Sequence, residues 1–427
     1  MNLFNHKAIF RLEQVFTPGG QPSVTYVDRA HLGIEATLRK AIALPSTIGS
    51  LTGPTKSGKT VLCRSVLSDF DYVWVDGGQI KSEIDLWSKI CSELKIASEI
   101  IAKISTANQV GGGVGADVTI GIPQANIKFG ATTNGSHIRI SEENTKFVPD
   151  TMHQAIDALV GKGIALVIDD FHYIGEKTRA DAIKSLKGAI FKGLKVVLLS
   201  TPHRAFEAIK AEAEITGRFK HVEVPPWSVD DLMLIAEIGF KALNVEKTDE
   251  VVNNLASESE GSPLLMQRFC WNICYDQKIT ETLPSVKKLD NFDIAALFNE
   301  VAEDAGLPIF ERLAKGPQSR TDRIRRPLIG GSDADIYEAI LLAVAMTGPK
   351  EKLSYDNIRS SLNSVLSDKI PQKIEVSNAL NHLTIIDKDE NKGQRAIDWD
   401  AQSLTLVITD PFFRFYLRWK VAKEKRK

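Results

Sequence analysis

Cysteine is scarce in this sequence, and its cysteines form no metal-binding pattern. Four occur among 427 residues, at positions 63, 91, 270 and 274, and no second set of Cys or His residues lies near them at the spacing of zinc ligands. Cys270 and Cys274 stand four residues apart in an apolar helical stretch, which is typical of a buried core pair. These observations exclude a small disulfide-stapled module, argue against a zinc site and indicate a reducing cytoplasm.

Long apolar runs and an excess of either charge are also lacking. The longest apolar run, residues 339–346, is too short to span a bilayer, and the first residues contain no apolar signal segment. Lys and Arg total 53 against 54 Asp and Glu, a net charge of −1, so no global field attracts nucleic acid or an anionic membrane. We therefore expect a cytoplasmic protein without a membrane partner, in which only a local patch can bind nucleic acid.

The residues that are present belong to a globular chain of several domains. Hydrophobic residues make up 43% and charged residues 25% of the chain, ordinary values for a protein with a packed core. At about 100–200 residues per domain, the length predicts two to four domains.

Short apolar segments alternate with helical patterns in the first half of the chain. They lie at residues 46–51, 72–76, 164–168 and 195–199. This alternation predicts an α/β core with a parallel sheet covered by helices on both faces. A Gly-rich alternating stretch at about residues 108–140 predicts an inserted β-hairpin, either a decorative surface feature or, as we favour, a contact ribbon for a neighbouring subunit or partner.

The second half of the chain is predominantly helical. The predicted domains are an N-terminal segment (1–45), the α/β core (46–227), an all-α lid (228–316), a basic linker (317–332) and a C-terminal domain (333–427). In the last of these we expect helices at 336–346, 355–366 and 373–383 and strands at 396–399 and 403–408. Three helices and a two-stranded wing outline a winged-helix domain.

Residues 53–60 match the phosphate-binding P-loop, Gly-x-x-x-x-Gly-Lys-Thr, between an expected strand and an expected helix. The glycines let backbone N–H groups turn toward phosphate, and the helix N-terminus adds the positive end of its dipole. We expect Lys59 to reach the β- and γ-phosphates of ATP and Thr60 to ligate Mg²⁺. The residues expected to bind the nucleotide here are Gly53, Pro54, Thr55, Lys56, Ser57, Gly58, Lys59, Thr60 and Val61.

An acidic pair, Asp169 and Asp170, ends the apolar segment 164–168, where P-loop proteins place their Walker B carboxylates. We expect Asp169 to hold Mg²⁺ and Asp170 to orient or deprotonate the attacking water. The pair and the phosphate loop together predict an ATPase.

Further polar groups follow the last two expected strands of the core. Ser200 or Thr201 can touch the γ-phosphate, with Arg204 as a weaker candidate, and the alternative that these residues only cap a strand and begin a helix stays open. Arg218 precedes the short strand expected at 221–224. We favour an arginine finger that acts on a neighbouring subunit's γ-phosphate over a plain surface arginine.

With these motifs the chain resembles the AAA+ and STAND superfamily of P-loop ATPases, in the branch of origin-recognition-type ATPases and bacterial STAND switches. The resemblance implies the domain order given above. An acidic pair that ends in Asp rather than Glu is similar to the STAND form, which implies slow turnover. The ending at residues 408–419, Ile-Thr-Asp-Pro-Phe-Phe-Arg-Phe-Tyr-Leu-Arg-Trp, is similar to the end of winged helices in prokaryotic ATPases of this branch.

The resemblance also implies contacts to the adenine base. Residues 16–18 (Phe-Thr-Pro) and 27–29 (Val-Asp-Arg) look like the adenine-contacting segment, in which Val27 touches the nucleotide and Asp28 stands where many relatives carry Gly. Residues 261–263 (Gly-Ser-Pro) are similar to the Gly-x-Pro signature of the STAND lid, which places Pro263 near the base and ribose.

One expected residue of the lid is missing. Origin-type relatives carry a sensor Arg three residues after such a Gly. This chain has Leu264 there, and Arg268 follows one turn later.

The motifs support two functional hypotheses. The first is a Mg²⁺-dependent ATPase that acts as a conformational switch, forms homo-oligomers through its ATP sites and controls a separate effector protein, in a context of anti-phage defence or signalling that the resemblance implies. The second is a DNA-binding initiator, loader or transposition regulator that places helix 373–383 on duplex DNA. Residues 331–427 hold 15 Lys and Arg against 14 Asp and Glu, which is not a basic footprint, but the basic linker and the tail 423–427 keep this hypothesis open.

Overall fold

The computed structural model describes residues 8–96, 118–122, 125–129, 139–141, 148–201, 217–289, 292–318, 322–390 and 395–422. The chain divides into two compact units. The sheet unit comprises Ala30–Gly53 and Leu62–Val224, and the helical unit comprises Met1–Arg29, Pro54–Val61 and Pro225–Lys427. The predicted phosphate loop therefore groups with the predicted lid and C-terminal domain.

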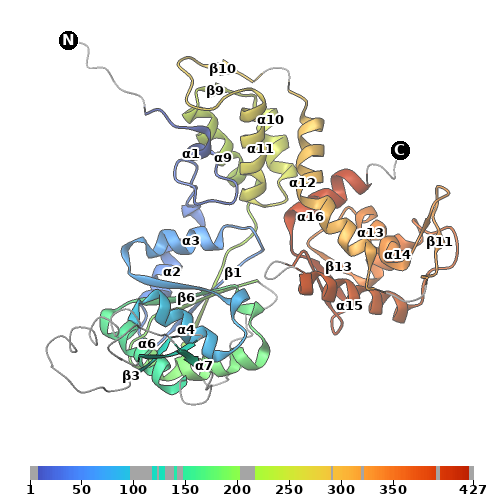
Figure 1. The fold of residues 1–427 in the computed structure, drawn as a ribbon. Helices are drawn as coiled ribbons and strands as arrows, with labels where there is room; N and C mark the ends of the chain where they lie inside the picture. The colour runs from blue at the N-terminus through green and yellow to red at the C-terminus, as the bar shows by residue number, and fades with distance from the viewer. Residues whose placement is uncertain are drawn as a thin grey trace, which may run out of the picture. The chain divides into compact units, whose positions relative to one another are not determined.

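The sheet unit is built on five parallel strands in the order β2-β6-β7-β1-β8. Figure 1 labels β1 and β6 of this sheet. The strands are β1 (Ile48–Thr52), β2 (Tyr72–Asp76), β6 (Ala165–Asp169), β7 (Val196–Ser200) and β8 (Phe219–Glu223). This confirms the predicted parallel sheet. The strand expected at 221–224 begins two residues earlier.

Helices cover both faces of this sheet. They are α2 (Ile34–Ala43), α3 (Lys59–Val66), α4 (Glu83–Glu93), α6 (Val148–Lys162) and α7 (Glu176–Phe191), with short turns η1 (Ala30–Leu32), η2 (Leu67–Asp69), η3 (Gly77–Gln79) and η4 (Phe171–Tyr173). Side chains of β6 alternate between two buried clusters: Ala165 and Val167 pack with α2 and α3, whereas Leu166 and Ile168 pack with α4, α6 and α7. Both faces of the strand are thus buried, which explains its uninterrupted apolar sequence.

A small antiparallel sheet joins the sequence between α4 and α6. Strand β3 (Val118–Ile122) pairs with β4 (Ala125–Phe129) as the predicted hairpin, and β5 (Arg139–Ser141) adds a third strand. The Gly-rich residues 108–117 lie outside the described residues. A strand of only three residues offers too little alternation for the sequence pattern to reveal it.

The first part of the helical unit contains helices α1 (Leu12–Val15), α9 (Val229–Ala242), α10 (Asp249–Glu258), α11 (Pro263–Asp276) and α12 (Ile294–Lys315) and strands β9 (Val245–Glu246) and β10 (Lys287–Lys288). Its C-terminal part contains β11 (Arg326–Pro327), β12 (Asp333–Ala334), α13 (Ile336–Met346), β13 (Lys352–Ser354), α14 (Tyr355–Leu362), α15 (Lys373–Glu390), β14 (Ile397–Asp400), β15 (Thr405–Ile408), α16 (Pro411–Tyr416) and the π-helical turn η7 (Leu417–Val421). Phe269 of α11, Phe298 of α12 and Phe415 of α16 meet with ring centroids 4.8–5.6 Å apart. The two parts therefore share one hydrophobic core.

The C-terminal elements include β12 and α16, which were not expected, and differ from the prediction in further respects. Strand β13, which was not expected, pairs with β15 and makes the small sheet three-stranded. Helix α14 ends at Leu362 rather than residue 366. Helix α15 runs past the predicted end at residue 383 to Glu390 because its last turns are held by buried Asp387, whose carboxylate pairs with Arg312 at 2.6 Å.

Within the part of the chain that the structure describes, no helix is both long enough and apolar enough to cross a bilayer.

Candidate nucleotide-binding site

Three strands of the sheet unit bring their polar carboxyl ends to one edge. Strand β7 lies between β1 and β6, with Thr52 level with Ser200 and Ile168 level with Leu198. The N–H of Gly53 donates to the carbonyl of Ser200 over 3.3 Å. Strand order therefore places Ser200 between the start of the phosphate loop and Asp169, the last residue of β6.

The acidic pair forms a tight turn. Asp170 adopts a left-handed conformation (φ 51°), and its N–H donates to Oδ1 of Asp169 over 2.9 Å. A Cβ at Gly77 would lie 2.7 and 2.8 Å from the carbonyl oxygens of Asp170 and Asp169. The close approach of η3 to this turn thus requires glycine. Neighbouring Asp76 accepts from the Gly78 N–H and from Gln79, so its carboxylate caps η3.

Thr201 presents a buried hydroxyl at the same edge. Its side chain is 5% exposed and that of Ser200 4%. Among the described residues, no hydrogen-bond partner is found for Oγ1 of Thr201. A buried hydroxyl without a protein partner is unfavourable unless something else bonds it, which suits the predicted contact to a phosphate. Arg204 lies outside the described residues.

The predicted phosphate loop adopts left-handed conformations and is held by two side chains of the helical unit, those of Trp227 and Ser262. Lys56 and Gly58 have φ of 60° and 89°. The carbonyl of Lys56 accepts from the Ser262 hydroxyl at 3.2 Å, and the carbonyl of Ser57 accepts from the Trp227 indole N–H at 2.9 Å. Because C=O and N–H point in opposite directions across a trans peptide, the Gly58 N–H faces away from Trp227. The Walker lysine, Lys59, donates to the carbonyl of Pro54 at 2.7 Å.

The Gly-Ser-Pro segment of the lid lies against this loop. Ser262 caps α11 by accepting from the N–H of Leu265, and Pro263 opens that helix. A Cβ at Gly58 would lie 3.9 Å from Cγ of Pro263. The residue that the resemblance assigned to the nucleotide is therefore a neighbour of the phosphate loop.

Trp227, which the sequence analysis did not single out, contacts both the phosphate loop and Arg29 of the N-terminal segment. The guanidinium of Arg29 lies 4.4 Å from the ring centroid of Trp227 and donates to the carbonyl of Pro225. Burial lowers the pKa of Arg29, opposed by the charge of Asp231. No motif marks Trp227 as functional, since it is one aromatic residue in a connecting segment.

Three residues from the sequence analysis have roles that the structure makes plain. Phe16, in the segment that the resemblance assigned to adenine, is fully buried, and its ring centroid lies 5.4 Å from that of Phe240 in the helical core. Val27 packs at the edge of the same core. Arg268 pairs with Asp304 of α12 at 3.1 Å, a contact between helices that accounts for its position without a sensor role.

Arg218 stands at the opposite edge of the sheet from the acidic pair. It precedes β8, whose first residue, Phe219, is level with Ile48 at the amino end of β1. Its guanidinium carbon lies 3.4 Å from the ring centroid of Phe191 at the end of α7. The five residues of β8 separate it from the carboxyl edge by roughly 16 Å, so Arg218 cannot serve the phosphate site of its own sheet.

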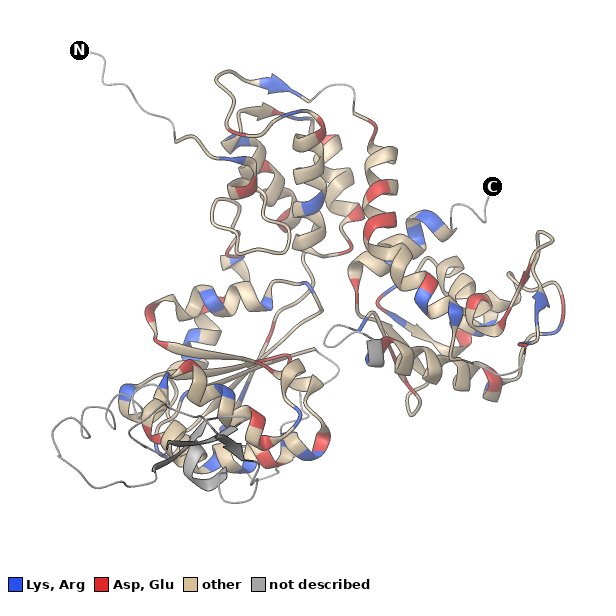
Figure 2. Ribbon diagram, viewed as in Figure 1, with Lys and Arg blue, Asp and Glu red and all other residues tan. Residues whose placement is uncertain are grey.

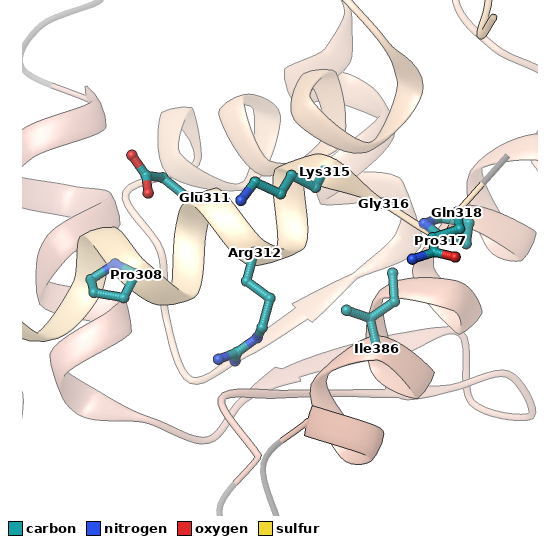
Figure 3. Close-up of a pocket in the computed structure, with 8 residues that line it drawn as sticks. All are labelled: Pro308, Glu311, Arg312, Lys315, Gly316, Pro317, Gln318 and Ile386. Atoms are coloured by element: carbon teal, nitrogen blue, oxygen red, sulfur yellow. The ribbon is translucent and has the colours of Figure 1, made fainter.

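A surface cavity of about 580 Å³ occurs elsewhere in the helical unit (Figure 3). It is lined by Pro308, Glu311, Arg312, Lys315, Gly316, Pro317, Gln318 and Ile386. Figure 3 shows that Arg312 and Glu311 leave α12 in different directions. Arg312 is paired with Asp387, and burial raises the pKa of that aspartate despite the pairing. The cavity contains none of the predicted nucleotide-binding residues.

The residues present suit ATP and Mg²⁺. The loop combines left-handed backbone at Lys56 and Gly58 with donors from Trp227 and Ser262 on two of its carbonyls. Left-handed backbone of this kind is typical of a phosphate nest. Oxygen donors such as Thr60 and Asp169 are the ligands that Mg²⁺ prefers. Thr201, whose hydroxyl has no protein partner among the described residues, adds a donor that suits a phosphate oxygen.

The fold and these motifs define a P-loop α/β protein. The chain is similar to a Walker-type ATPase of Pyrococcus abyssi, with 14% identity over 90% of this chain and 94% of that one and a TM-score of 0.52. It also matches the ORC2 protein of Aeropyrum pernix (12% identity, 97% and 98% coverage, TM-score 0.47) and the ORC1 protein of the same organism in complex with DNA (12%, 99% and 98%, 0.46). No protein-family model matches the sequence, and no curated protein matches it. At 14% identity the first likeness establishes the fold.

Proposed function

We propose that this protein binds and slowly hydrolyses ATP with Mg²⁺ and acts as an oligomerising conformational switch. The observation that carries the proposal is the order of strands at the sheet edge. The P-loop follows β1, the acidic pair ends β6, and the polar end of β7 lies between them.

The proposed roles follow from the chemistry of each side chain. Lys59 binds the β- and γ-phosphates, the loop N–H groups hold the phosphate oxygens, and Asp170 orients and deprotonates the attacking water. Thr60 and Asp169 hold Mg²⁺, which supplies charge neutralisation on the phosphates when bound. Ser200 or Thr201 donates to a γ-phosphate oxygen.

A charge interaction supports the pairing of the two motifs. Cys63 lies on α3, the helix that Lys59 and Thr60 open, and its side chain is fully buried. Burial raises the pKa of the Cys63 thiol, and the negative charge of Asp169 raises that pKa further. Cys63 on α3 is thus close enough to Asp169 for an electrostatic interaction between them.

The remaining assignments extend the switch model. Val27 and Pro263 approach the adenosine, and Arg218 acts in trans on a neighbour's γ-phosphate because its own phosphate site lies across the sheet. ATP-dependent assembly of identical subunits then controls a separate effector protein, in anti-phage defence or signalling. We also propose that the C-terminal domain, with helices α13–α15 and the β13-β15-β14 sheet, is a winged helix.

The contacts of the C-terminal domain weigh against the DNA-binding alternative. In the linker, Arg323 pairs with Asp335 and Arg326 with Glu375 on α15, and Arg325 donates to a backbone carbonyl, while Arg320 lies outside the described residues. Figure 2 shows both charge signs interspersed over the elements of this domain. A DNA-binding face needs cations that are available to phosphates.

Nucleotide titration of matched variants tests the proposal. Lys59→Ala should abolish ATP binding, because the loop loses the lysine assigned to the β- and γ-phosphates, while circular dichroism and thermal melting stay unchanged. Asp170→Asn should bind ATP and lose hydrolysis, measured as phosphate release. Lys192→Ala, a change of an exposed lysine on the same sheet unit, should behave as wild type. A folded Lys59→Ala protein with wild-type affinity would contradict the assignment.

A further inference from the structure

The phosphate loop contains a second lysine in an unusual backbone conformation. Lys56 has φ of 60°, a left-handed region that residues with a Cβ rarely adopt and that glycine adopts freely. Such a residue persists where surrounding contacts determine its conformation, and these positions gather at functional sites. The contacts of Lys56 therefore indicate its purpose.

The side chain of Lys56 is held by the last helix of the chain. Its Nζ lies 2.5 Å from Oδ2 of Asp410, with the two side chains 19% and 8% exposed, and 4.5 Å from the ring centroid of Phe412. Both contacts lie within the helical unit. A half-shielded ion pair of this kind interacts more strongly than a surface pair, because water and salt screen it less.

The same carboxylate begins α16. Oδ1 of Asp410 accepts from the N–H groups of Phe412 at 2.8 Å and Phe413 at 3.2 Å, as an N-cap does. One oxygen of Asp410 thus organises the helix while the other binds the phosphate loop. The loop contact and the cap of α16 therefore share one carboxylate.

Two arginines, one on α16 and one on the following turn η7, contact Glu260, which lies just before α11. Arg414 donates to the side chain and the carbonyl of Glu260 at 2.8 and 2.7 Å, and Arg418 contacts Glu260 at 2.9 Å. Glu260 stands two residues before Ser262, whose hydroxyl donates to the carbonyl of Lys56. The loop, lid corner and α16 therefore form a continuous set of polar contacts.

We propose that Asp410 competes with nucleotide phosphate for Lys56, so that phosphate binding at the loop weakens the docking of α16. The inference rests on the proposed ATP site. A phosphate and a carboxylate are both anions that a single ammonium attracts, and a carboxylate beside a phosphate site repels the incoming charge. By linkage, the ligand loosens α16 by the same factor by which docked α16 weakens the ligand.

The direct test is the ATP affinity of the full-length Asp410→Asn protein. Asparagine caps helices as well as aspartate does, so α16 keeps its start while the competing charge is lost. We expect ATP affinity to rise by between about 5-fold and about 150-fold, the span of typical coupling between sites. If the Lys56–Asp410 contact only stabilised the loop, the Asp410→Asn change would lower the ATP affinity instead.

A matched control is available in the same unit. Asp335 caps α13 by accepting from the N–H groups of Tyr337 and Glu338 and pairs with Arg323 at 2.6 Å. Asp335→Asn removes a cap charge and an ion pair of the same kind away from the loop. Its ATP affinity should equal that of wild type.

A second measurement uses the wild-type protein and needs no variant. Hydrogen exchange at the amides of Phe412 and Phe413 should accelerate when ATP binds, and adenosine, which has no phosphate, should leave it unchanged. If wild type binds no ATP, the proposed function fails and this inference with it. If wild type binds ATP but Asp410→Asn has equal or lower affinity, or exchange in α16 does not respond, the competition is overturned while ATP binding stands.

Discussion

At the scale of single residues, the candidate site depends on backbone conformations that most residues avoid. Asp170 and Lys56 both have left-handed φ values, 51° and 60°. Strained residues of this kind are retained where a site needs a side chain and a turn at the same place. Gly77 supports one of these turns by having no side chain, because the carbonyls of Asp169 and Asp170 fill the space where a Cβ would stand.

Gly77→Ala should therefore damage the acidic turn more than the fold. The added Cβ meets backbone atoms that cannot rotate away, and we expect a loss of roughly 1–3 kcal/mol in unfolding free energy with a larger proportional loss of ATP hydrolysis than of ATP binding. Denaturant melts, nucleotide titration and phosphate release check this. Gly175→Ala, two residues after η4 and with open space around its Cβ, is the control, and equal behaviour of the two variants would refute the steric argument.

At the scale of elements, close helix packing connects the lid to the end of the chain. Gly306 in α12 is buried, and a Cβ there would lie 2.1 Å from Cβ and 2.4 Å from Cγ of Tyr416 in α16. The two helices approach closely because Gly306 lacks a side chain. The position of α16, and with it that of Asp410, depends on this contact.

Gly306→Ala should push α16 away from α12. Overpacking of this kind destabilises by about 1–3 kcal/mol, and we expect a lowered melting temperature together with faster hydrogen exchange in α16. Gly188→Ala on α7, which has no atom within 4 Å of the new Cβ, should instead stabilise by about 0.5–1 kcal/mol because alanine favours the helix. A Gly306→Ala protein as stable as wild type would show that α12 and α16 can move apart without loss of stability, and would contradict this prediction.

At the scale of the whole molecule, the position of Arg218 distinguishes the model of a monomeric ATPase from that of an oligomeric one. The arginine and the acidic pair occupy opposite edges of one sheet. A guanidinium there can reach a γ-phosphate only in another copy of the chain. The switch model therefore requires subunit contacts that the single chain does not contain.

Mixing two inactive variants tests that requirement. Arg218→Ala should bind ATP yet fail to hydrolyse it or to form ATP-dependent oligomers, and Asp170→Asn should also fail to hydrolyse it. Combined, the two proteins pair an intact site with an intact finger at some interfaces, so part of the wild-type phosphate release should return. A silent mixture, with wild-type protein hydrolysing ATP as a monomer on size-exclusion chromatography, would favour a monomeric ATPase.

Local sequence determined the elements of the core and the motifs. Four short apolar segments predicted β1, β2, β6 and β7 to within two residues. The segments of β6 and β7 are uninterrupted because these central strands are covered on both faces, where polar residues cannot alternate with apolar ones. The spacing of Gly58 and Lys59 likewise marked the phosphate loop, since its chemistry needs those residue types in a fixed order. Short strands such as β13 carry too little pattern to be predicted.

Only the tertiary structure decided which distant residues meet at the loop. Trp227 and Asp410 contact Ser57 and Lys56 across 170 and 354 positions of sequence, and nothing in the local pattern of either residue indicates a partner. Phe16 belongs to the segment that the resemblance assigned to adenine, yet its ring packs against Phe240 in the helical core. Local chemistry thus fixes what a segment can bind, whereas long-range packing decides which partner it has.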